Sequence, residues 1–500
     1  MAYSRLTELT NLAVPSYDDL LYIVNDPGGV AGSYKAALST LPDMFYPELH
    51  GAMGDGVTDD SVAIQAAIDA AGANEGGIVK LTRTYLVSQQ GIRDFAFYAD
   101  VDYALQVPYS NVGVVGPGTL MMTTAPVTTM NRFVVLAFGT GGTDDGSVPY
   151  EDGDWSVSNH CIGVTFDMSG LSLVERQAIN SNPSGIIEMA YCKHFLVADN
   201  TILEGFGFGP INTLPSSKLG NIVNNRVLGA CRCGMWLDGL RGSTVRGNVI
   251  AGDIWGITDS IASNGIAILA NSDNKTNSGH NVISGNVLIN CKGGAIAGTG
   301  IFQQIIGNTI YHTTGGGTAI RLTQSSNANG EYSSSGSTII DNVIHHTLNL
   351  PTAKAIVLEG KTVGGYDGSP VELEDWAIQG NVINDNWGIS VELGEQAKNG
   401  LILNNHLPGD INEDVTATGN IIRENTGYVT ENHGAAAAVA DGGTIAHGCA
   451  DTPTVVEVTA SLANEFASVT AIGAANITVA IKKHDGTPGT NQTIFWRAYV

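Results

Sequence analysis

Residues 51–81, GAMGDGVTDDSVAIQAAIDAAGANEGGIVKL, combine an acidic turn, a helical pattern and the start of a strand. Asp59 and Asp60 stand before the predicted helix 61–71, where a carboxylate can accept hydrogen bonds from free N–H groups of the first turn. Asp55 lies between two glycines, where Asp commonly bonds its own backbone. A carboxylate pair for acid–base chemistry is the rival interpretation. Because capping and turn formation explain every residue, we predict a structural role.

An Asn followed by apolar, often β-branched, residues recurs along the middle of the chain. The members are Asn200, Asn225, Asn248, Asn286, Asn308, Asn342, Asn381, Asn405 and Asn420. Successive differences between these positions are 25, 23, 38, 22, 34, 39, 24 and 15 residues, and a second unit of the type G-x-A-I-x-L follows most of them. A base period of 22 to 25 residues with short strands is the signature of a parallel β-solenoid. We expect the Asn side chains to stack as a ladder inside a bend, each amide bonding the next.

Three of these intervals are longer than the others. Their additional residues follow the second strand at matching places, 269–280, 322–337 and 358–375. Insertions at equivalent positions of successive turns stack on one edge, so these polar loops should wall a groove along the solenoid. The first interval is ambiguous, because residues 255–260, WGITDS, could themselves start the strand.

Residues 51–81 resemble the opening motif of the pectate-lyase superfamily of right-handed parallel β-helices. The shared features are the Gly-Ala pair, the GDG turn, the T-D-D sequence, the short helix and the Gly-Gly before a strand. The resemblance implies an all-β, right-handed parallel β-helix whose open end is covered by the helix. Its apolar stripe would draw on Val62, Ile64, Ala67 and Ile68. One departure is residues 81–87, LTRTYLV, where the family usually has a Pro-x-Gly turn.

Composition limits the classes of protein to which the chain can belong. Hydrophobic residues make up 43% and charged residues 14%, which is not a disordered composition. The net charge of −25 argues against nucleic acid as a partner and leaves solubility, or cation sites between carboxylates, as roles for the acidity. Neither an apolar signal-peptide core nor a membrane-length apolar run is present, so we expect no signal peptide and no membrane insertion. We expect the six Cys to be reduced and mostly buried, as in a protein made in a reducing cytosol; they are Cys161, Cys192, Cys231, Cys233, Cys291 and Cys449.

Three segments are predicted: a small hairpin-like module at 1–45, the β-helix at 46–426, and a linker with a C-terminal antiparallel β domain at 427–500. Residues 427–440 are interpreted as the linker. Residues 11–40 resemble N-terminal modules that anchor phage tail proteins to the virion, and the C-terminal part resembles domains that end many spikes. Together the three parts resemble a phage tailspike. The resemblance implies a virion tail protein, assembled in the host cytoplasm, whose trimers bind and often cleave surface polysaccharide.

Candidate site residues come from aligning the second strands on their Gly and inward apolar residues. This alignment places Asp238, Leu269, Arg321, Val357 and Glu392 in one outward row. We predict that carboxylates act as general acid, base or nucleophile for glycoside hydrolysis and that tryptophans stack on sugars. Arg321 would bind an acidic sugar or stabilise charge in a lyase reaction. The predicted catalytic residues are Asp238, Asp253 and Asp259, and the predicted substrate-binding residues are Trp236, Trp255, Arg321, Glu359 and Glu392.

Each of these residues also has a structural interpretation. Outward Asp on a β-helix is usually solvated, and Trp236 could belong to the core. His345 and His346 should point to opposite faces of a strand, so they cannot jointly bind one metal. The acidic loop 139–155 lacks the order of ligands of a calcium loop. We therefore predict no metal site and no cofactor, with Ca²⁺ left open.

Three functions remain after this comparison. The first is a glycan-degrading spike, the second is a non-catalytic adhesin or structural tail protein, and the third is a free polysaccharide lyase or epimerase. The partners predicted for the first are host surface polysaccharide and tail or baseplate proteins that bind residues 1–45. We expect a homotrimer, because side-by-side helices would bury exposed apolar faces.

Overall fold

The computed structural model describes part of the 500-residue chain. The described ranges are 20–25, 32–37, 43–95, 98–126, 133–139, 156–179, 185–207, 209–213, 217–229, 233–251, 264–269, 279–291, 294–313, 317–323, 325–327, 330–332, 334–360 and 371–500.

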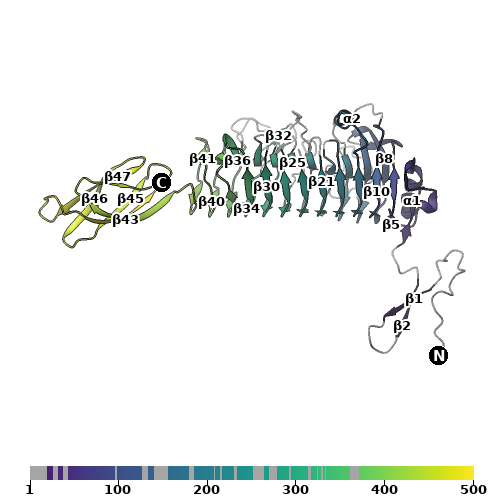
Figure 1. Cartoon of the computed structure of the whole chain (residues 1–500), viewed down its shortest axis with the longest axis horizontal. Coiled ribbons are helices and arrows are strands. Elements are labelled where there is room, and N and C mark those ends of the chain that lie inside the picture. Colours follow the sequence, from purple (N-terminus) through teal and green to yellow (C-terminus); the bar gives the residue numbers. More distant parts are fainter. Residues whose placement is uncertain are drawn as a thin grey trace.

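Among the described residues, three long sheets of 11, 12 and 13 strands form a rod (Figure 1). The eleven-stranded sheet contains β4 (Asp55–Asp59), β6 (Thr84–Leu86), β10 (Thr119–Met121), β14 (Thr165–Asp167), β18 (Thr201–Leu203), β21 (Arg226–Leu228), β24 (Val249–Ala251), β27 (Val287–Ile289), β30 (Thr309–His312), β35 (Val343–His346) and β38 (Val382–Ile383). The twelve-stranded sheet contains β7 (Gly91–Phe95), β8 (Tyr98–Val107), β11 (Phe133–Phe138), β15 (Gly185–Met189), β19 (Ile211–Thr213), β22 (Cys233–Asp238), β25 (Asn264–Leu269), β28 (Gly294–Gly298), β31 (Thr318–Thr323), β36 (Leu350–Glu359), β39 (Trp387–Leu393) and β41 (Asp410–Glu413). The thirteen-stranded sheet contains β3 (Met44–Phe45), β5 (Gly77–Lys80), β9 (Val112–Val115), β13 (His160–Ile162), β17 (Leu196–Ala198), β20 (Asn221–Val223), β23 (Thr244–Arg246), β26 (Val282–Ser284), β29 (Gln304–Ile306), β34 (Thr338–Ile340), β37 (Ala377–Gln379), β40 (Leu401–Leu403) and β42 (Ile421–Arg423).

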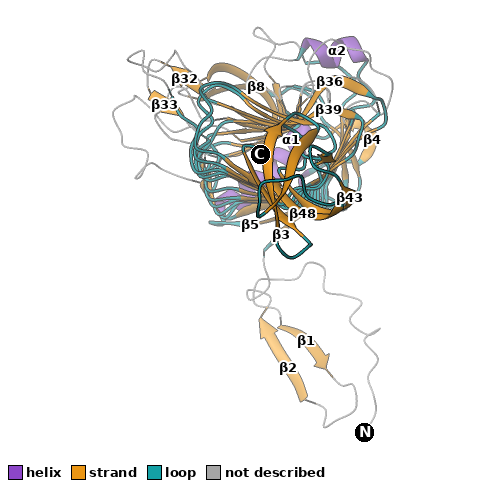
Figure 2. Cartoon of the chain, turned by 90° about the vertical axis from the view of Figure 1, so that its left-hand side faces the viewer, coloured by secondary structure: helices purple, strands orange, loops and turns teal. Residues whose placement is uncertain are grey.

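The chain visits the three sheets in a fixed order, and one passage through all three is called a rung below. In one rung β20 is followed by β21 and β22, and β23 then pairs in parallel with β20. Alternate residues point inward, so Ile222, Val227 and Leu237 lie buried in the core between the sheets. Seen along the rod, the strands surround this interior (Figure 2). The predicted parallel β-helix is confirmed.

The Asn ladder is confirmed at the corner between the thirteen- and eleven-stranded sheets. Each Asn Nδ2 donates to the Oδ1 of the Asn one rung further, at 2.9–3.0 Å, from Asn200 to Asn405. The last member was predicted wrongly. Asn405 donates to Asn425 at 3.0 Å, whereas Asn420 donates to the Ala397 carbonyl oxygen at 3.1 Å. With Asn425 as the last member, the interval from Asn405 to Asn425 is close to the base period of 22 to 25 residues.

The opening motif closes one end of the rod, as predicted. Helix α1 (Ser61–Ala73) lies at this end in Figure 1, after η3 (Pro47–His50), and buries Ile64 and Ile68 in the core. Val62 is 71% exposed and does not belong to the buried stripe, because it lies on the opposite side of the helix.

The three carboxylates of the motif have structural partners. The Asp59 Oδ1 accepts the Ser61 N–H at the helix start at 3.0 Å. The Asp60 carboxylate instead accepts the N–H groups of Met53 and Gly54 at 2.7 and 3.0 Å. Asp55 accepts the N–H groups of residues 57 and 58 within its own turn, and these bonds hold the pKa of its carboxyl below the ordinary value.

The C-terminal part forms two antiparallel sheets at the other end of the rod (Figure 1). They contain β43 (Glu431–Val439), β48 (Gln492–Tyr499) and β45 (Val455–Ala460), and β44 (Thr444–Ala446), β47 (Asn476–Lys483) and β46 (Glu465–Ile472). The segment 427–440, predicted to be a linker, is mostly strand β43. Ala435 and Ala436 of this segment pair with β48. A run of alanines favours helix over strand, so the composition of the segment did not predict this pairing.

The remaining described elements are short. They are the antiparallel hairpin of β1 (Leu20–Asn25) and β2 (Gly32–Ala37), the pair β12 (Ser156–Val157) and β16 (Cys192–Lys193), the hairpin of β32 (Ser325–Asn327) and β33 (Gly330–Tyr332), and α2 (Leu173–Ala178). The five described Cys are free thiols, four buried and Cys449 partly buried, while Cys231 lies outside the described residues. In the described ranges, no helix is long and apolar enough to cross a membrane.

Candidate functional site

The outward side chains of the twelve-stranded sheet form one row that runs along the rod, here called the outer row. Strand register joins its members in order: Glu188, Asn212, Trp236, Ala267, Ala297, Arg321, Val357, Glu392 and Asn412. Adjacent strands are about 4.8 Å apart, so the row places one side chain on each successive rung. A chain-like ligand lying along the rod would meet the accessible members of this row, which are Trp236, Ala297, Arg321, Glu392 and Asn412.

The outer row corrects the alignment predicted from sequence. Arg321 pairs with Val357, and Val357 pairs with Glu392, as expected. Asp238 pairs with Leu269 and lies in the neighbouring row, two residues further along the strands, with Thr323 and Glu359. Trp236, not Asp238, therefore shares the outer row with Arg321.

The physical reason for this shift is that Gly and Ala share one small inward position. Gly234 of β22 is equivalent to Gly265, but in β31 the equivalent residue is Ala319, two residues after Gly317. Aligning strands on their glycines therefore displaced the C-terminal strands by two residues.

The three insertions leave the β-helix at one edge, as predicted. The strands before them end at Leu269, Thr323 and Glu359, which register places at equivalent positions. Asp238 ends β22 at the same edge. Asp253, Trp255 and Asp259 lie outside the described residues, as does the acidic loop 140–155.

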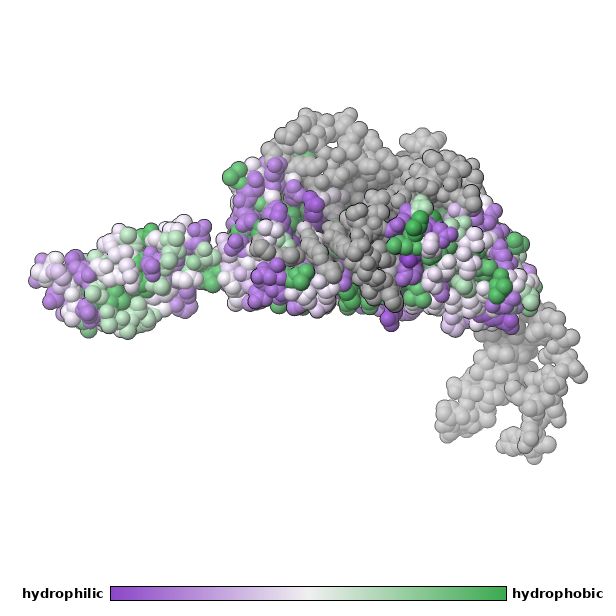
Figure 3. Space-filling model, turned by 45° about the horizontal axis from the view of Figure 1, so that its top comes forward, coloured by the Kyte–Doolittle hydropathy of each residue, from purple (hydrophilic) through white to green (hydrophobic). Residues whose placement is uncertain are grey.

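Charged residues of the C-terminal rungs form ion pairs across neighbouring strands. The Arg321 Nη2 lies 3.1 Å from the Glu359 Oε2, and the Lys354 Nζ lies 2.6 Å from the Glu392 Oε1. All four side chains are at least partly exposed. Solvent-exposed pairs of this kind contribute about 0–1 kcal/mol, so a charged ligand could displace either partner at low cost. Hydrophilic residues also gather over these rungs in Figure 3.

The N-terminal part of the outer row is buried and polar. Glu188 and Asn212 have no accessible surface, and Asp238 is 7% exposed. Within the part of the chain that the structure describes, neither amide atom of Asn212 has a hydrogen-bond partner, although Asn212 lies between Glu188 and Trp236. A buried polar group without a partner costs about 1–3 kcal/mol, so this amide needs an explanation. Trp236 is partly exposed, and it gives the neighbouring rung a surface that solvent can reach.

Sequence reasoning missed Glu188 and Asn212. A signal was present, because Glu188 is the single charged residue in the apolar strand GIIEM, which matches the inward pattern of later strands. Register places Glu188 and Asp238 on strands separated by one strand, or about 10 Å along the rod. Asp238 is also offset from the outer row by two residues, or about 7 Å along the strand, so the two backbone positions are roughly 12 Å apart. Acid and base carboxyl groups on opposite sides of a glycosidic bond are roughly 6.5–9.5 Å apart, so the two side chains would have to extend toward each other.

The histidines take structural positions, as predicted. His345 points outward and stacks on Tyr311 at a ring-centroid distance of 4.9 Å, whereas His346 points inward and stacks on His312 at 5.8 Å. Over the described part of the chain, no group of three or more His, Cys, Asp or Glu side chains is placed to hold a metal ion.

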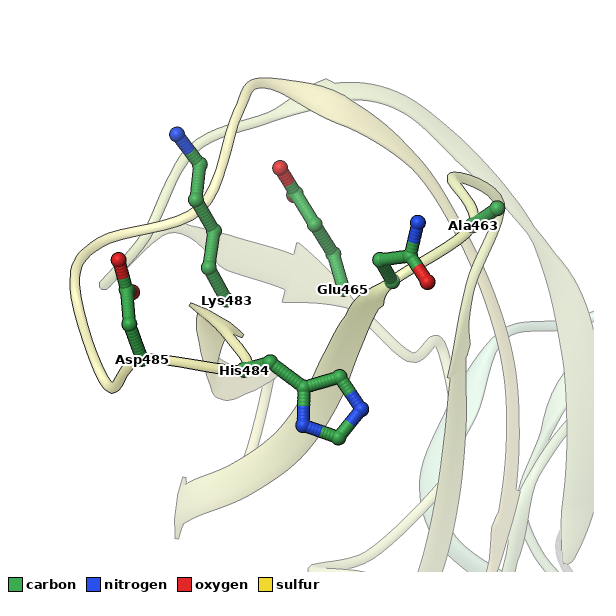
Figure 4. A pocket seen from close by; sticks show the side chains of 6 residues that line it. Ala463, Glu465, Lys483, His484 and Asp485 are labelled. Carbon is green, nitrogen blue, oxygen red and sulfur yellow. The ribbon is translucent and has the colours of Figure 1, made fainter.

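A shallow hollow lies at the tip of the C-terminal sheets (Figure 4). It is lined by residues 463–465 and 483–485. Both carboxylates in it have neighbours in the same chain: Glu465 accepts the Thr490 N–H at 2.9 Å, and Asp485 accepts the Thr487 N–H at 3.0 Å. The hollow therefore gives no evidence of a functional site.

Comparisons with known proteins agree with this architecture. Residues 148–278 match a family model described as periplasmic copper-binding protein (NosD). No curated protein matches the sequence.

Two solved structures cover most of the chain. The surface adhesin PfbA of Streptococcus pneumoniae is 18% identical with a TM-score of 0.55, covering 76% of this chain and 93% of its own. A double mutant of the tailspike protein of E. coli bacteriophage HK620, in complex with a pentasaccharide, is 11% identical with a TM-score of 0.51, covering 96% and 97%. At sequence identities this low, the structural similarity shows a shared fold and nothing about function. The chain is therefore a right-handed parallel β-helix protein, a fold that it shares with a phage tailspike and a bacterial surface adhesin.

Proposed function

We propose that this protein is a phage tail spike that binds host surface polysaccharide along the outer row and cleaves it. The observation that carries the proposal is Asn212, a fully buried outward amide whose donor and acceptor both lack a partner among the described residues. Because the amide has no accessible surface in the free chain, the proposal includes a local opening that lets two adjacent sugar hydroxyls, one donating and one accepting, reach both amide atoms. The partly exposed Trp236 indole on the next rung offers an aromatic face for a sugar ring.

Carboxylates around this amide supply the proposed chemistry. Glu188 and Asp238 flank Asn212 and Trp236, and in this proposal one protonates the leaving oxygen while the other activates water. Asp253 and Asp259 remain proposed catalytic residues and Trp255 a proposed stacking residue. Arg321, Glu359 and Glu392 are proposed to bind charged groups of the glycan further along the row. The similarity to a tailspike that holds a pentasaccharide supports a saccharide as the ligand.

The virion role includes two further proposals. Residues 1–45 would attach the spike to tail or baseplate proteins, and three copies would form the working assembly. A non-catalytic adhesin is the second candidate function. The likeness to the pneumococcal adhesin and the ion pairing of Arg321, Glu359 and Glu392 favour it, because paired charges serve binding more readily than proton transfer.

The test uses the full chain and a panel of purified bacterial capsule and O-antigen polysaccharides. Binding is measured by surface plasmon resonance, and cleavage by new reducing ends and by the ultraviolet absorbance of unsaturated sugars. We expect Asn212→Leu to weaken binding at least about tenfold. Glu188→Gln and Asp238→Asn should keep binding and lower the cleavage rate about 100-fold or more.

Asp167→Asn is the matched control, because Asp167 lies outward on the eleven-stranded sheet, away from the outer row. Binding that depends on Asn212 without any product would establish the adhesin. Full binding and cleavage by Asn212→Leu would remove the outer row as the site, and failure to bind any glycan of the panel would count against the spike.

A further inference from the structure

Three basic side chains lie one above another at the corner where the chain turns from the twelve-stranded to the thirteen-stranded sheet. Parallel bridges join Lys193 to Lys218 and Lys218 to Arg241, and these three residues are here called the basic row. Each member follows one of the strands β15, β19 and β22, which also carry Glu188, Asn212 and Trp236. The basic row therefore runs parallel to the N-terminal part of the outer row, along the same three rungs.

All three members of the basic row point away from the core. The residues immediately before them are fully buried, and they are Cys192, Ser217 and Leu240. Lys193 and Lys218 are partly exposed, and Arg241 is exposed. The row thus presents its positive charges at the surface of the rod, where a ligand can reach them.

Rungs nearer the C-terminus treat their basic residues differently. Arg321 and Lys354 each form an ion pair with a glutamate on the next rung. Neither Lys193 nor Arg241 forms an ion pair with any residue that the structure describes. In the basic row, the neighbour on the next rung is another cation instead of a carboxylate.

The two ends of the basic row are uncharged as well. Register places Val157 before Lys193 and Gly279 after Arg241. Adjacent strands are about 4.8 Å apart, and like charges opposite each other on neighbouring strands are destabilising. Two unit charges at this distance repel by about 1 kcal/mol in water. Solvation of a chain with 48 acidic and 23 basic residues does not require three stacked cations, whereas an anionic ligand would remove their repulsion.

We propose that the basic row binds the anionic groups of a polysaccharide that lies along the rod, so that the glycan is an acidic one. This inference rests on the proposed function and names its substrate class. Carboxylate or phosphate groups along the polymer would meet one cation on each of three successive rungs. Lys binds such groups as a point charge, and Arg binds them through two parallel hydrogen bonds. Because the net charge of the chain is −25, this local cluster of cations also selects where a polyanion can approach.

The test measures binding of the full chain by biolayer interferometry at about 50 mM and about 200 mM salt. The acidic probes are polysialic acid and polygalacturonate, which carry carboxylates, and phosphomannan, which carries phosphates; the neutral probes are carboxyl-reduced polygalacturonate and dephosphorylated mannan. Wild type should bind at least one acidic probe about tenfold more tightly than the neutral probes, and more weakly at high salt.

Lys193→Gln combined with Arg241→Gln should weaken binding of that acidic probe at least about tenfold. It should also lower the slope of log K against log salt by about 1–2, because fewer counterions are released on binding. The control is Arg226→Gln combined with Arg423→Gln, which removes the same charge from exposed positions on the other two sheets and should leave binding unchanged.

Equal losses in the two double variants would overturn the assignment to the basic row. Equal binding of acidic and neutral probes, or acidic binding that ignores Lys193→Gln with Arg241→Gln, would overturn the acidic class and leave the proposed glycan-binding function standing. Double-stranded DNA bound as tightly as the acidic probe would overturn a saccharide as the ligand of this row. Failure to bind any probe, and any glycan of the capsule and O-antigen panel, would overturn both proposals.

Discussion

His312 and His346 lie one above the other inside the β-helix, and the indole of Trp387 lies edge-on to both rings at 5.9 and 5.3 Å. Neither His has accessible surface. The His346 Nδ1 accepts the Leu348 N–H at 2.9 Å, while the ring nitrogens of His312 lack hydrogen-bond partners among the described residues. Burial, and then the nearby His346, lower the pKa of His312 to about 4. The folded protein therefore keeps this ring neutral in mildly acidic solution.

We expect His312 to reduce stability as the pH falls from 6.5 to about 4. The unfolded chain takes up a proton near the ordinary pKa and the folded chain only near the lowered one, so the unfolded state gains about 3 kcal/mol across this window. Below the lowered pKa both states are protonated and the effect stops growing. His312→Phe should lose this part of the acid sensitivity in urea unfolding measured at about pH 7 and about pH 4.5.

His345→Phe is the matched control, because the His345 ring points outward and stacks on Tyr311. It should keep the pH dependence of wild type. An unchanged pH dependence in His312→Phe would show that the ring already takes up its proton near pH 6.5 in the folded state.

At the scale of elements, the corner between the thirteen- and eleven-stranded sheets is held by amides rather than by apolar packing. The Asn308 Oδ1 accepts both the backbone N–H and the side-chain Nδ2 of Asn286, at 3.0 and 2.9 Å. Its own Nδ2 donates to the Ile283 carbonyl oxygen and to Asn342, both at 2.9 Å. Each corner thus satisfies the buried polar groups of the corner before it.

Asn308→Ala should lower the free energy of unfolding by about 3 kcal/mol, because it removes the acceptor of the buried Asn286 N–H, one of the two acceptors of the Asn286 Nδ2, and one donor to the Ile283 carbonyl oxygen. Chemical unfolding monitored by circular dichroism measures this change. Asn221→Ala, an exposed outward Asn on β20, should change stability by less than about 0.5 kcal/mol. Similar losses for the two variants would mean that the ladder contributes nothing specific.

The Asn ladder also shows which parts of the fold can be predicted from the sequence. Eight of its members were predicted because every rung imposes the same requirement, an amide followed by an apolar strand. The ninth was missed because Asn425 is followed by Thr426 and Gly427, whereas Asn420 precedes two isoleucines and imitates the pattern.

The candidate site was harder to predict than the fold. Each rung contributes one outward residue, so the neighbours of Asn212 come from strands more than 20 residues away in each direction. Their contact depends on register and on loop length, and the exchange of Gly234 for Ala319 at one inward position was enough to displace the predicted row. Periodicity therefore predicts the rod well and the juxtapositions on its surface poorly.

Among the described residues, the β-helix and the C-terminal sheets have separate hydrophobic cores, a large one and a small one. One extends through the β-helix from Ala52 to Ala417, and the other joins six buried residues of the C-terminal sheets, from Val439 to Ile494. A core this small supplies little hydrophobic stabilisation. Tryptophans report on each separately, because Trp376 and Trp387 lie in the first core and Trp496 packs against the second.

We expect two unfolding transitions in guanidinium chloride. The C-terminal sheets should unfold first and change the fluorescence of Trp496, and the β-helix should follow at higher denaturant concentration. The Trp496→Phe variant should lose the first fluorescence transition and keep the second. A single transition that coincides for fluorescence and circular dichroism would show that the two parts unfold as one cooperative unit.

The common edge from which the three insertions leave has an evolutionary consequence. Each insertion begins and ends within one rung, and the strands on either side keep their register with the next rung. Recombination between related genes can therefore exchange one such segment without altering the shaft. Such exchange would diversify one edge of the rod while the register of its strands remains the same.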